Sequence, residues 1–332
     1  MRRMGAVQAQ DYPGAKWAIA LRAPKLADAE IERAYDEGRI LRTHVLRPTW
    51  HFVSPEDIGW MLVLTAPRIR AAMAWSDRQL EIDDALKSQV RRRLERVLRD
   101  GRSRTRAEVS TDLARAGIAV TGQRLWHLMA HAEIERVVCS GPRRGKEFTY
   151  ALFDERASPD DRRDRDAALG TLAQRFFSSH GPATAADFGW WSGLTMGDAR
   201  RGTDIAGTSL ARVAFDGREY LVDLSLPPPG RRRLPDLLLP SFDEYAVGYK
   251  DRKALVHERA SGVEPGMGLL SQGLVLAGRF AGTWTRTPAR GGFRLDVSPR
   301  VALSAAERKS IAAAVARYAR FLGQAVDHRV TA

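Results

Sequence analysis

Cysteine and histidine are scarce in this sequence. Its 332 residues include one cysteine, Cys139, which excludes an internal disulfide framework and a zinc site built from clustered cysteines. Of the seven histidines, His127 and His131 have the i, i+4 spacing of a helical metal site, but they lack the glutamate of an HExxH motif. We therefore expect no bound metal and no other cofactor.

Long apolar runs are also missing. No stretch approaches the roughly 20 apolar residues that a membrane-spanning helix needs. The opening residues, MRRMGAVQAQDY, contain no apolar segment of the length found in a signal peptide. We expect a protein of the cytoplasm, associated with the nucleoid and not with a membrane.

Lysine is rare, and the charge comes from arginine. Only 7 of the 53 basic residues are lysine, and with 40 acidic residues the formal net charge is +13. Arginine suits phosphate oxygens and base edges better than lysine does. A GC-rich genome also favours arginine, so charge alone leaves a ribosomal, membrane or protein partner open beside nucleic acid.

Apolar residues make up 44% of the chain, enough for two or three folded domains. Three segments repeat one order of elements: helix, turn, capped helix and hairpin. This order predicts an α+β fold with winged-helix domains in tandem, at 1–98, 99–156 and 169–207. The remainder, 208–332, reads as a small β-barrel-like domain with a C-terminal helix.

The first segment has helical patterns at 13–22 and 28–37, then strand patterns at 40–46 and 50–53. Ser54 is expected to cap the helix that follows, because serine is a favourable N-cap and a proline comes next.

The second segment contains the clearest local signal. Thr105 and Glu108 have the spacing of a capping box, which predicts a helix start. Strands at 137–140 and 147–152 then flank a glycine-bounded basic loop at 141–146, which we interpret as a wing. Its charges, Arg143, Arg144 and Lys146, are either DNA contacts or ordinary solvated loop charges.

The third segment and the rest of the chain repeat these signals. Thr184 caps a helix with Asp187 three residues later, and Asp216-Gly217 predicts a hairpin. The further elements that we expect are strands at 210–215, 218–224, 274–280, 282–286 and 292–297 and a helix at 305–322.

Five motifs occur in one order along nearly the whole chain. They are QAQDYP at 8–13, RTHVLRPTWH at 42–51, GPATAADFGWWSG at 181–193, LPSFDEY at 239–245 and GRFAGTW at 278–284. Together they resemble the signatures of the AlkZ/YcaQ family of DNA glycosylases. That resemblance implies tandem winged helices and a β-barrel region that hold double-stranded DNA with alkylated bases, and it implies a monomer without cofactor.

The resemblance also assigns catalysis to a Gln-x-Gln motif, matched here by Gln8 and Gln10. A cationic alkylated purine, such as N7-alkylguanine or N3-alkyladenine, is already a good leaving group and needs little acid assistance. Two amide oxygens can accept hydrogen bonds from a water below the sugar. Bulky adducts and interstrand crosslinks are further substrates that the family implies. Judged by residue type alone, the two glutamines are surface residues of a tail.

The family usually carries a further helix before this motif, which here lies within ten residues of Met1. We therefore expect an N-terminally short first winged helix. A non-catalytic DNA-binding protein or transcriptional regulator, or an inactive homologue, remains an alternative to a glycosylase.

Other candidate residues follow the same resemblance. The 42–51 block alternates like a half-buried strand, and its polar side chains either are satisfied internally or line the cleft and touch phosphates. Asp243 either caps a turn or faces DNA. The candidate DNA contacts, besides the three wing charges, are Thr43, His44, Arg47, Thr49, His51, Asp243 and Arg252.

Overall fold

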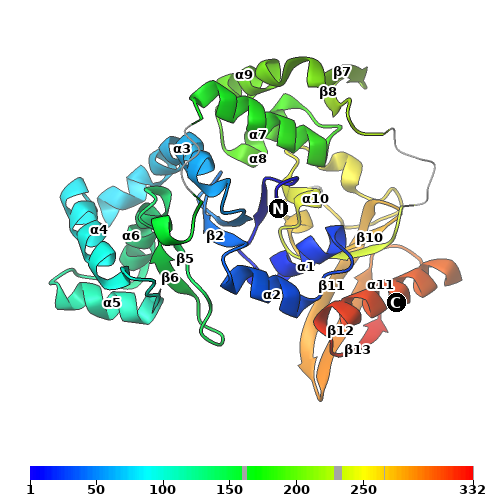
Figure 1. The fold of residues 1–332 in the computed structure, drawn as a ribbon. Helices are drawn as coiled ribbons and strands as arrows, with labels where there is room; N and C mark the ends of the chain where they lie inside the picture. The colour runs from blue at the N-terminus through cyan, green and yellow to red at the C-terminus, as the bar shows by residue number, and fades with distance from the viewer. Residues whose placement is uncertain (159–162, 228–233, 265, 332) are drawn as a thin grey trace. The chain divides into compact units, whose positions relative to one another are not determined.

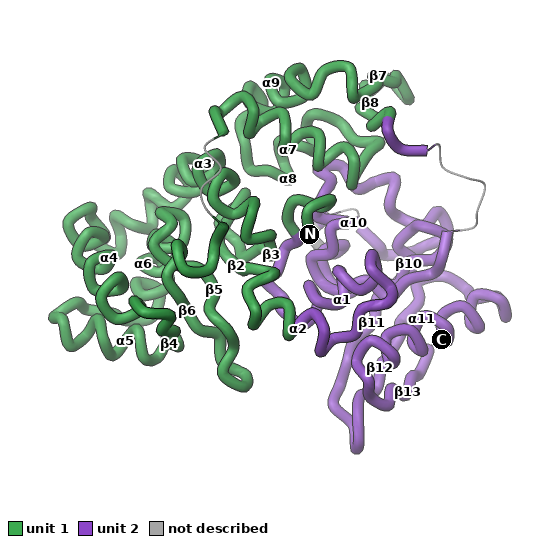
Figure 2. Tube along the Cα trace, in the orientation of Figure 1, with its two compact units in different colours: residues 1–6, 33–224 green, residues 7–32, 225–332 purple. Residues whose placement is uncertain are grey.

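The computed structural model describes residues 1–158, 163–227, 234–264 and 266–331 (Figure 1). The chain divides into two compact units (Figure 2). Unit 1 contains residues 1–6 and 33–224, and unit 2 contains residues 7–32 and 225–332. Two elements cross the boundary, β1 (Ala6–Gln8) and α2 (Asp28–Asp36). This division is coarser than the four expected domains, whose boundaries remain a prediction.

Unit 1 begins with the hairpin of β2 (Leu41–His44) and β3 (Trp50–Val53), paired antiparallel with Leu41 opposite Val53. The long helix α3 (Ile58–Gln79) follows. Asp57 is its N-cap residue and makes no side-chain capping bond, because its carboxylate accepts from the hydroxyl of Ser54 at 2.7 Å. Ser54 therefore orients Asp57 and does not cap the helix itself, which corrects the sequence-based expectation.

The middle of unit 1 is a small helical layer beside a three-stranded sheet. The capping box of Thr105 and Glu108 is present at the start of α5, so that prediction is confirmed. The sheet order is β4-β6-β5, and the core includes Leu94, Val109 and Leu128. The elements are α4 (Asp84–Leu98), β4 (Arg104–Thr105), α5 (Arg106–Arg115), α6 (Gly122–Ile134), β5 (Val138–Ser140) and β6 (Thr149–Leu152).

The last part of unit 1 packs three helices around an aromatic core. Phe176 lies 5.4 Å from Phe188 and 5.2 Å from Trp191, ring centre to ring centre. The capping box of Thr184 and Asp187 is also confirmed. The elements are α7 (Arg165–His180), α8 (Ala185–Ser192), α9 (Met196–Ala206) and the hairpin of β7 (Leu210–Phe215) and β8 (Arg218–Asp223).

Unit 2 joins α1 (Tyr12–Arg22) to the C-terminal part of the chain. Trp17 of α1 packs at 4.9 Å from Tyr318 of α11, ring centre to ring centre, and Trp284 lies 5.5 Å from the same tyrosine. The remaining elements are β9 (Leu237–Leu239), α10 (Glu244–Val247), β10 (Gly273–Leu276), β11 (Arg279–Ala289), β12 (Gly292–Pro299), α11 (Ala305–Leu322) and β13 (Ala325–Val330).

The sheet of unit 2 is open. Its order is β13-β12-β11-β10-β9, and β13 joins in parallel after α11, an addition that the sequence did not predict. The residues that the structure describes thus form no closed barrel, because β9 and β13 are edge strands at opposite ends. The strand expected at 274–280 is interrupted at Ala277 and Gly278, whose positive φ values turn β10 into β11.

Four short 3-10 helices complete the described structure: Phe153–Glu155, Gly207–Ser209, Lys253–Leu255 and Met267–Leu270. Both helices and strands are thus well represented, which fits the expected α+β class. The tandem winged-helix arrangement within that class remains a prediction.

Candidate active site and nucleic-acid interface

The Gln-x-Gln motif lies at the end of β1 and the start of α1. Gln8 is the last residue of β1 and is 7% exposed, whereas Gln10 is exposed. Asp11 caps α1 by accepting from the backbone N–H of Gly14 at 3.2 Å. Gln10 lies in a bend between β1 and α1, two residues after the end of the strand.

Residues 237–245, which include the LPSFDEY motif, pack against this segment inside unit 2. Glu244 accepts a hydrogen bond from the backbone N–H of Gln8 at 2.7 Å. The indole N–H of Trp17 donates to the carbonyl of Leu238 at 2.7 Å. A Cβ at Gly14 would lie 3.0 Å from the Pro240 Cβ and 2.4 Å from an Asp11 carboxylate oxygen, so glycine is needed for this approach.

Asp243 makes its observed contacts inside unit 2. Its carboxylate accepts two hydrogen bonds from the guanidinium of Arg22, at 3.0 and 2.7 Å, and caps α10 by accepting from the Tyr245 N–H at 2.8 Å. Burial lowers the pKa of Arg22, but the attraction of Asp243 outweighs it, so the net shift is upward. The capping interpretation of Asp243 thus agrees with the structure.

Arg252, the other candidate in this unit, is 5% exposed and donates from Nε to the carbonyl of Ala246 at 2.8 Å. Its burial leaves little of the side chain for a phosphate. DNA contact by Asp243 or Arg252 remains a prediction, whereas their contacts inside unit 2 are observed.

The candidate residues on β2 and β3 lie in unit 1 and are largely buried. Thr43, His44 and His51 are at most 1% exposed. Glu133 of α6 accepts from the backbone N–H of His44 at 2.9 Å and lies 2.6 Å from His44 Nδ1. His51 Nδ1 lies 2.9 Å from the carbonyl of Thr49. The interpretation of internally satisfied polar groups is thus met at Nδ1 of His44 and not at its buried Nε2, which has no hydrogen-bond partner among the described residues. DNA contact by these residues stays a prediction.

The 42–51 and 181–193 motifs meet inside unit 1. A Cβ on Gly193 would lie 2.3 Å from the carbonyl oxygen of Leu46, and both residues have positive φ. Arg47, the next residue, is only partly buried. The glycine of the GWWSG sequence therefore shapes the turn that carries Arg47 and Thr49.

An arginine sandwiched between aromatic rings is a feature that the sequence analysis missed. The guanidinium of Arg42 lies 4.3 Å from the ring centre of Trp50 and 4.6 Å from that of Phe148, and Arg143 lies 4.8 Å from Phe148. Such stacking holds cationic side chains in fixed directions. Arg42 and Phe148 come from distant parts of the chain, so no local sequence pattern marks their contact.

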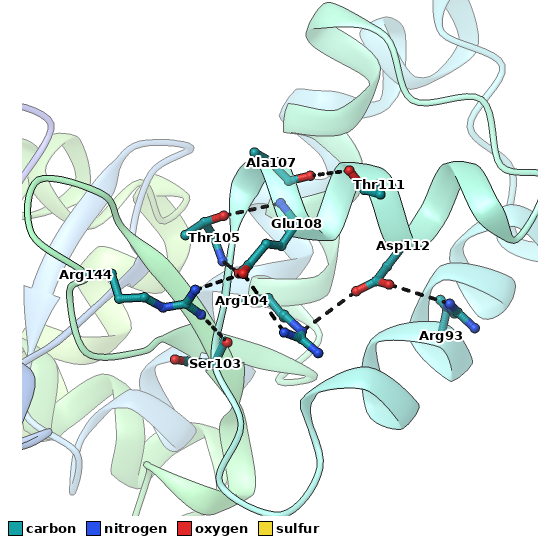
Figure 3. A network of polar contacts seen from close by, with 9 residues as sticks. All are labelled: Arg93, Ser103, Arg104, Thr105, Ala107, Glu108, Thr111, Asp112 and Arg144. Atoms are coloured by element: carbon teal, nitrogen blue, oxygen red, sulfur yellow. Dashed lines mark hydrogen bonds and ion pairs between the residues drawn. The ribbon is translucent and has the colours of Figure 1, made fainter.

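The three wing charges differ in their surroundings. Arg144 donates to Glu108 at 2.8 Å and to the carbonyl of Ser103 at 2.7 Å, as Figure 3 shows. Arg143 donates from its backbone N–H to Asp36 at 2.8 Å, and Lys146 is exposed. The pKa of the Glu108 carboxyl is lowered, chiefly by its hydrogen bond from Arg144.

The same network borders an open hollow of about 370 Å³ on α5. Arg104 bridges Glu108 and Asp112, at 4.0 and 3.9 Å, and Arg93 lies 3.7 Å from Asp112 (Figure 3). The hollow is lined by Arg104, Ala107, Glu108, Thr111, Asp112 and Arg115. Since acidic and basic groups alternate there, the hollow favours neither an anion nor a cation.

His127 and His131 share one carboxylate, Asp77 of α3. His127 Nδ1 lies 3.0 Å from one oxygen and His131 Nε2 lies 2.8 Å from the other. Among the described residues no group of three or more His, Cys, Asp or Glu is placed to hold a metal ion. The three side chains instead join α3 to α6.

Among the residues that the structure describes, no helix combines the length and the apolar composition of a membrane span.

The fold is shared with a solved structure, DNA glycosylase AlkZ of Streptomyces sahachiroi. The similarity has a TM-score of 0.77 at 24% identity and covers 99% of this chain and 92% of that one. A curated relative from the same organism, named interstrand DNA cross-link repair glycosylase, is 29% identical over 313 residues. That match covers 85% of this chain and 80% of the relative.

A family model that matches residues 1–321 places the protein among the enzymes that hydrolyse N-glycosyl bonds in DNA. That model is described as DNA glycosylase AlkZ-like, and the chain belongs to this family. The resemblance inferred from the five motifs is thereby confirmed.

Proposed function

We propose that this protein removes cationic alkylated purines from double-stranded DNA, with Gln8 and Gln10 holding the attacking water. The observation that carries the proposal is the anchored Gln-x-Gln segment. Gln8 is bonded through its backbone to Glu244, and Gln10 directly precedes the capped start of α1. Gln10 lies in the short bend between β1 and α1, so the two amides flank a short connection between two elements.

The proposed reaction needs little acid or base catalysis from such a site. Alkylation at N7 of guanine or N3 of adenine gives the base a positive charge. When the bond from the sugar C1′ to the base breaks, the electron pair neutralises the departing purine. Water then adds to C1′ and loses a proton to solvent. The amide oxygens accept hydrogen bonds from this water and present negative dipoles to the cationic sugar.

An amide is not a base at neutral pH, so Gln8 and Gln10 cannot deprotonate the water. The proposal therefore restricts the substrates to bases that leave unaided. Interstrand crosslinks and bulky adducts through N7 meet this condition, and the Streptomyces sahachiroi relative is named for cross-link repair. We include N7-linked crosslinks among the substrates to be tested.

DNA would be held through its phosphates by arginines and lysines of unit 1. Arg144 and Lys146 are exposed candidates, and Arg47 is partly exposed. Phosphate contacts carry little sequence information, so the duplex around a lesion would be bound with little sequence preference.

The test is single-turnover release of bases from duplexes that differ in one nucleotide. We expect release of N7-methylguanine and N3-methyladenine and no release of hypoxanthine or uracil. A duplex with an N7-guanine interstrand crosslink provides the second substrate class. Efficient uracil release would contradict the proposed mechanism, and release of no base at all would favour a non-catalytic DNA-binding protein or an inactive homologue.

A further inference from the structure

Two neighbouring acids at the start of α10 hold the two ends of the segment that carries the Gln-x-Gln motif. Glu244 accepts from the backbone of Gln8, and Asp243 accepts from the guanidinium of Arg22. Residues 8 and 22 enclose Gln10 and all of α1. This segment is therefore attached to unit 2 at both ends by adjacent carboxylates.

We propose that Glu244 is a positioning residue for base excision, which fixes the direction of the Gln8 and Gln10 side chains by holding the Gln8 backbone N–H. This inference rests on the proposed function of the two glutamines. Glu244 itself touches neither water nor substrate in this role. It acts through the conformation of β1.

The geometry of the contact supports such a role. The distance from Gln8 N to Glu244 Oε1 is 2.7 Å, at the short end of the range for charge-assisted hydrogen bonds. Glu244 is 1% exposed and Gln8 is 7% exposed, so water competes little for this contact. A rotation of the backbone at residue 8 would swing its side chain, and displacement of a catalytic group by about 1 Å can cost on the order of 10²-fold in rate.

Glu244 is also held firmly. It is the first residue of α10, which is capped by Asp243 through the Tyr245 N–H at 2.8 Å. The hydroxyl of Tyr245 donates to the carbonyl of Gly278 at 2.5 Å, which ties α10 to the start of β11. Residues of the LPSFDEY and GRFAGTW motifs thus fix the position of Glu244, which accepts the hydrogen bond from Gln8 of the QAQDYP motif.

Two variants of similar volume separate the hydrogen bond from other effects. Glu244→Gln keeps an oxygen acceptor and loses the charge, whereas Glu244→Met removes the acceptor and fills the space. We expect E244M to slow single-turnover release of N7-methylguanine on the order of 10²-fold. E244Q should restore the rate to within about tenfold of the wild type, because a neutral acceptor makes a weaker bond. The Kd for DNA should change less than about twofold in both.

The backbone itself gives a readout that does not depend on activity. Hydrogen exchange of the Gln8 amide, followed by NMR with ¹⁵N-glutamine labelling, should be slow in the wild type and in E244Q and fast in E244M. The matched control is Glu258→Met, an exposed glutamate of unit 2 that pairs with Arg279. It should alter neither the Gln8 exchange nor the rate.

The inference is overturned if E244M excises at the wild-type rate, if its Gln8 amide stays protected, or if E244Q is as slow as E244M. The last result would mean that the charge acts and the hydrogen bond does not. A wild-type protein that releases no base would overturn the proposed function, and this inference with it, whereas an active wild type with an equally active E244M would overturn this inference alone.

Discussion

The guanidinium of Arg144 lies 2.8 Å from the carboxylate of Glu108, so one positive charge of the basic loop is paired with an acid of the same protein. Both groups are partly exposed, and such surface pairs contribute little to stability. A DNA phosphate could replace Glu108 as the partner of Arg144. The pair therefore sets how much positive charge this loop offers to DNA.

Replacing Glu108 by glutamine should strengthen DNA binding. Glutamine can still occupy this position of the capping box at α5, so the helix start is kept. With Arg144 released, affinity for duplex DNA should rise about fivefold, and the slope of log affinity against log salt should steepen by about one. Fluorescence anisotropy with a labelled undamaged duplex over a range of salt measures both.

The control for this variant is Glu95→Gln. Glu95 pairs with Arg91 on the surface of α4, and its loss changes the net charge by the same amount. If both variants tighten DNA binding equally, the change in net charge explains the effect and the release of Arg144 does not.

Binding of the wild type should depend strongly on salt. A protein with a net charge of +13 is expected to neutralise several phosphates and release their counterions. With six phosphate contacts the affinity would fall on the order of 10³-fold between about 50 and 200 mM salt. Filter binding with duplexes of two unrelated sequences checks the salt effect and the sequence preference together. An affinity for DNA that does not change with salt concentration would argue against phosphate contacts as the main source of binding.

Gln8→Ala and Gln10→Ala should each abolish most base excision and leave DNA binding intact. Removal of one preorganised hydrogen-bond partner at a catalytic site costs on the order of 10²-fold or more in rate. Single-turnover release of N7-methylguanine measures the loss, and the Kd for DNA shows whether binding is unchanged.

Gln123→Ala is a suitable control, because this exposed glutamine of α6 lies outside the proposed site. Wild-type excision rates in both motif variants would leave Gln8 a buried structural residue and Gln10 an ordinary surface residue.

Stability should fall in mild acid, in part through His131. Burial lowers the pKa of this histidine, and Asp77 only partly compensates. Because the folded-state pKa lies below the unfolded value of about 6.5, the unfolded chain binds the proton more readily. This contribution is therefore complete above about pH 6.5 and is lost as pH falls toward the folded-state pKa.

Urea unfolding at several pH values from 8 down to 5 tests this prediction. His131→Gln should reduce the decline in the free energy of unfolding, whereas His328→Gln on the edge strand β13 should not. An equal decline in wild type and H131Q would exclude His131 as a source of acid sensitivity.

Local features of the fold were predictable from sequence. The capping boxes at Thr105 and Thr184 depend on residues three positions apart, and the hairpin at Asp216-Gly217 depends on two adjacent residues. Such signals act within one turn and do not need the rest of the chain. The open sheet of unit 2 was not predictable, because β13 pairs with β12 across the intervening helix α11 and no local signal marks such a pairing.

The candidate site was likewise predictable only in part. Gln8 and Gln10 were found by resemblance, and their catalytic role stays a prediction. The residues that hold the candidates in place, among them Glu133, Asp77 and Glu244, were missed. Their partners lie 89, 50 and 236 positions away, and a buried acid has no sequence signature that names its partner. The oligomeric state stays a prediction.

The hydrogen bond from Gln8 to Glu244 spans 236 positions of the chain. At translation rates of about 5 to 20 residues per second, roughly 10 to 50 s separate the synthesis of the two residues. The first glutamines of the chain leave the ribosome long before their supporting partner exists. A nascent or prematurely ended chain that lacks Glu244 therefore lacks the bond that holds the Gln8 backbone, so the segment that carries the two proposed water-binding glutamines is completed only after most of the chain has been made.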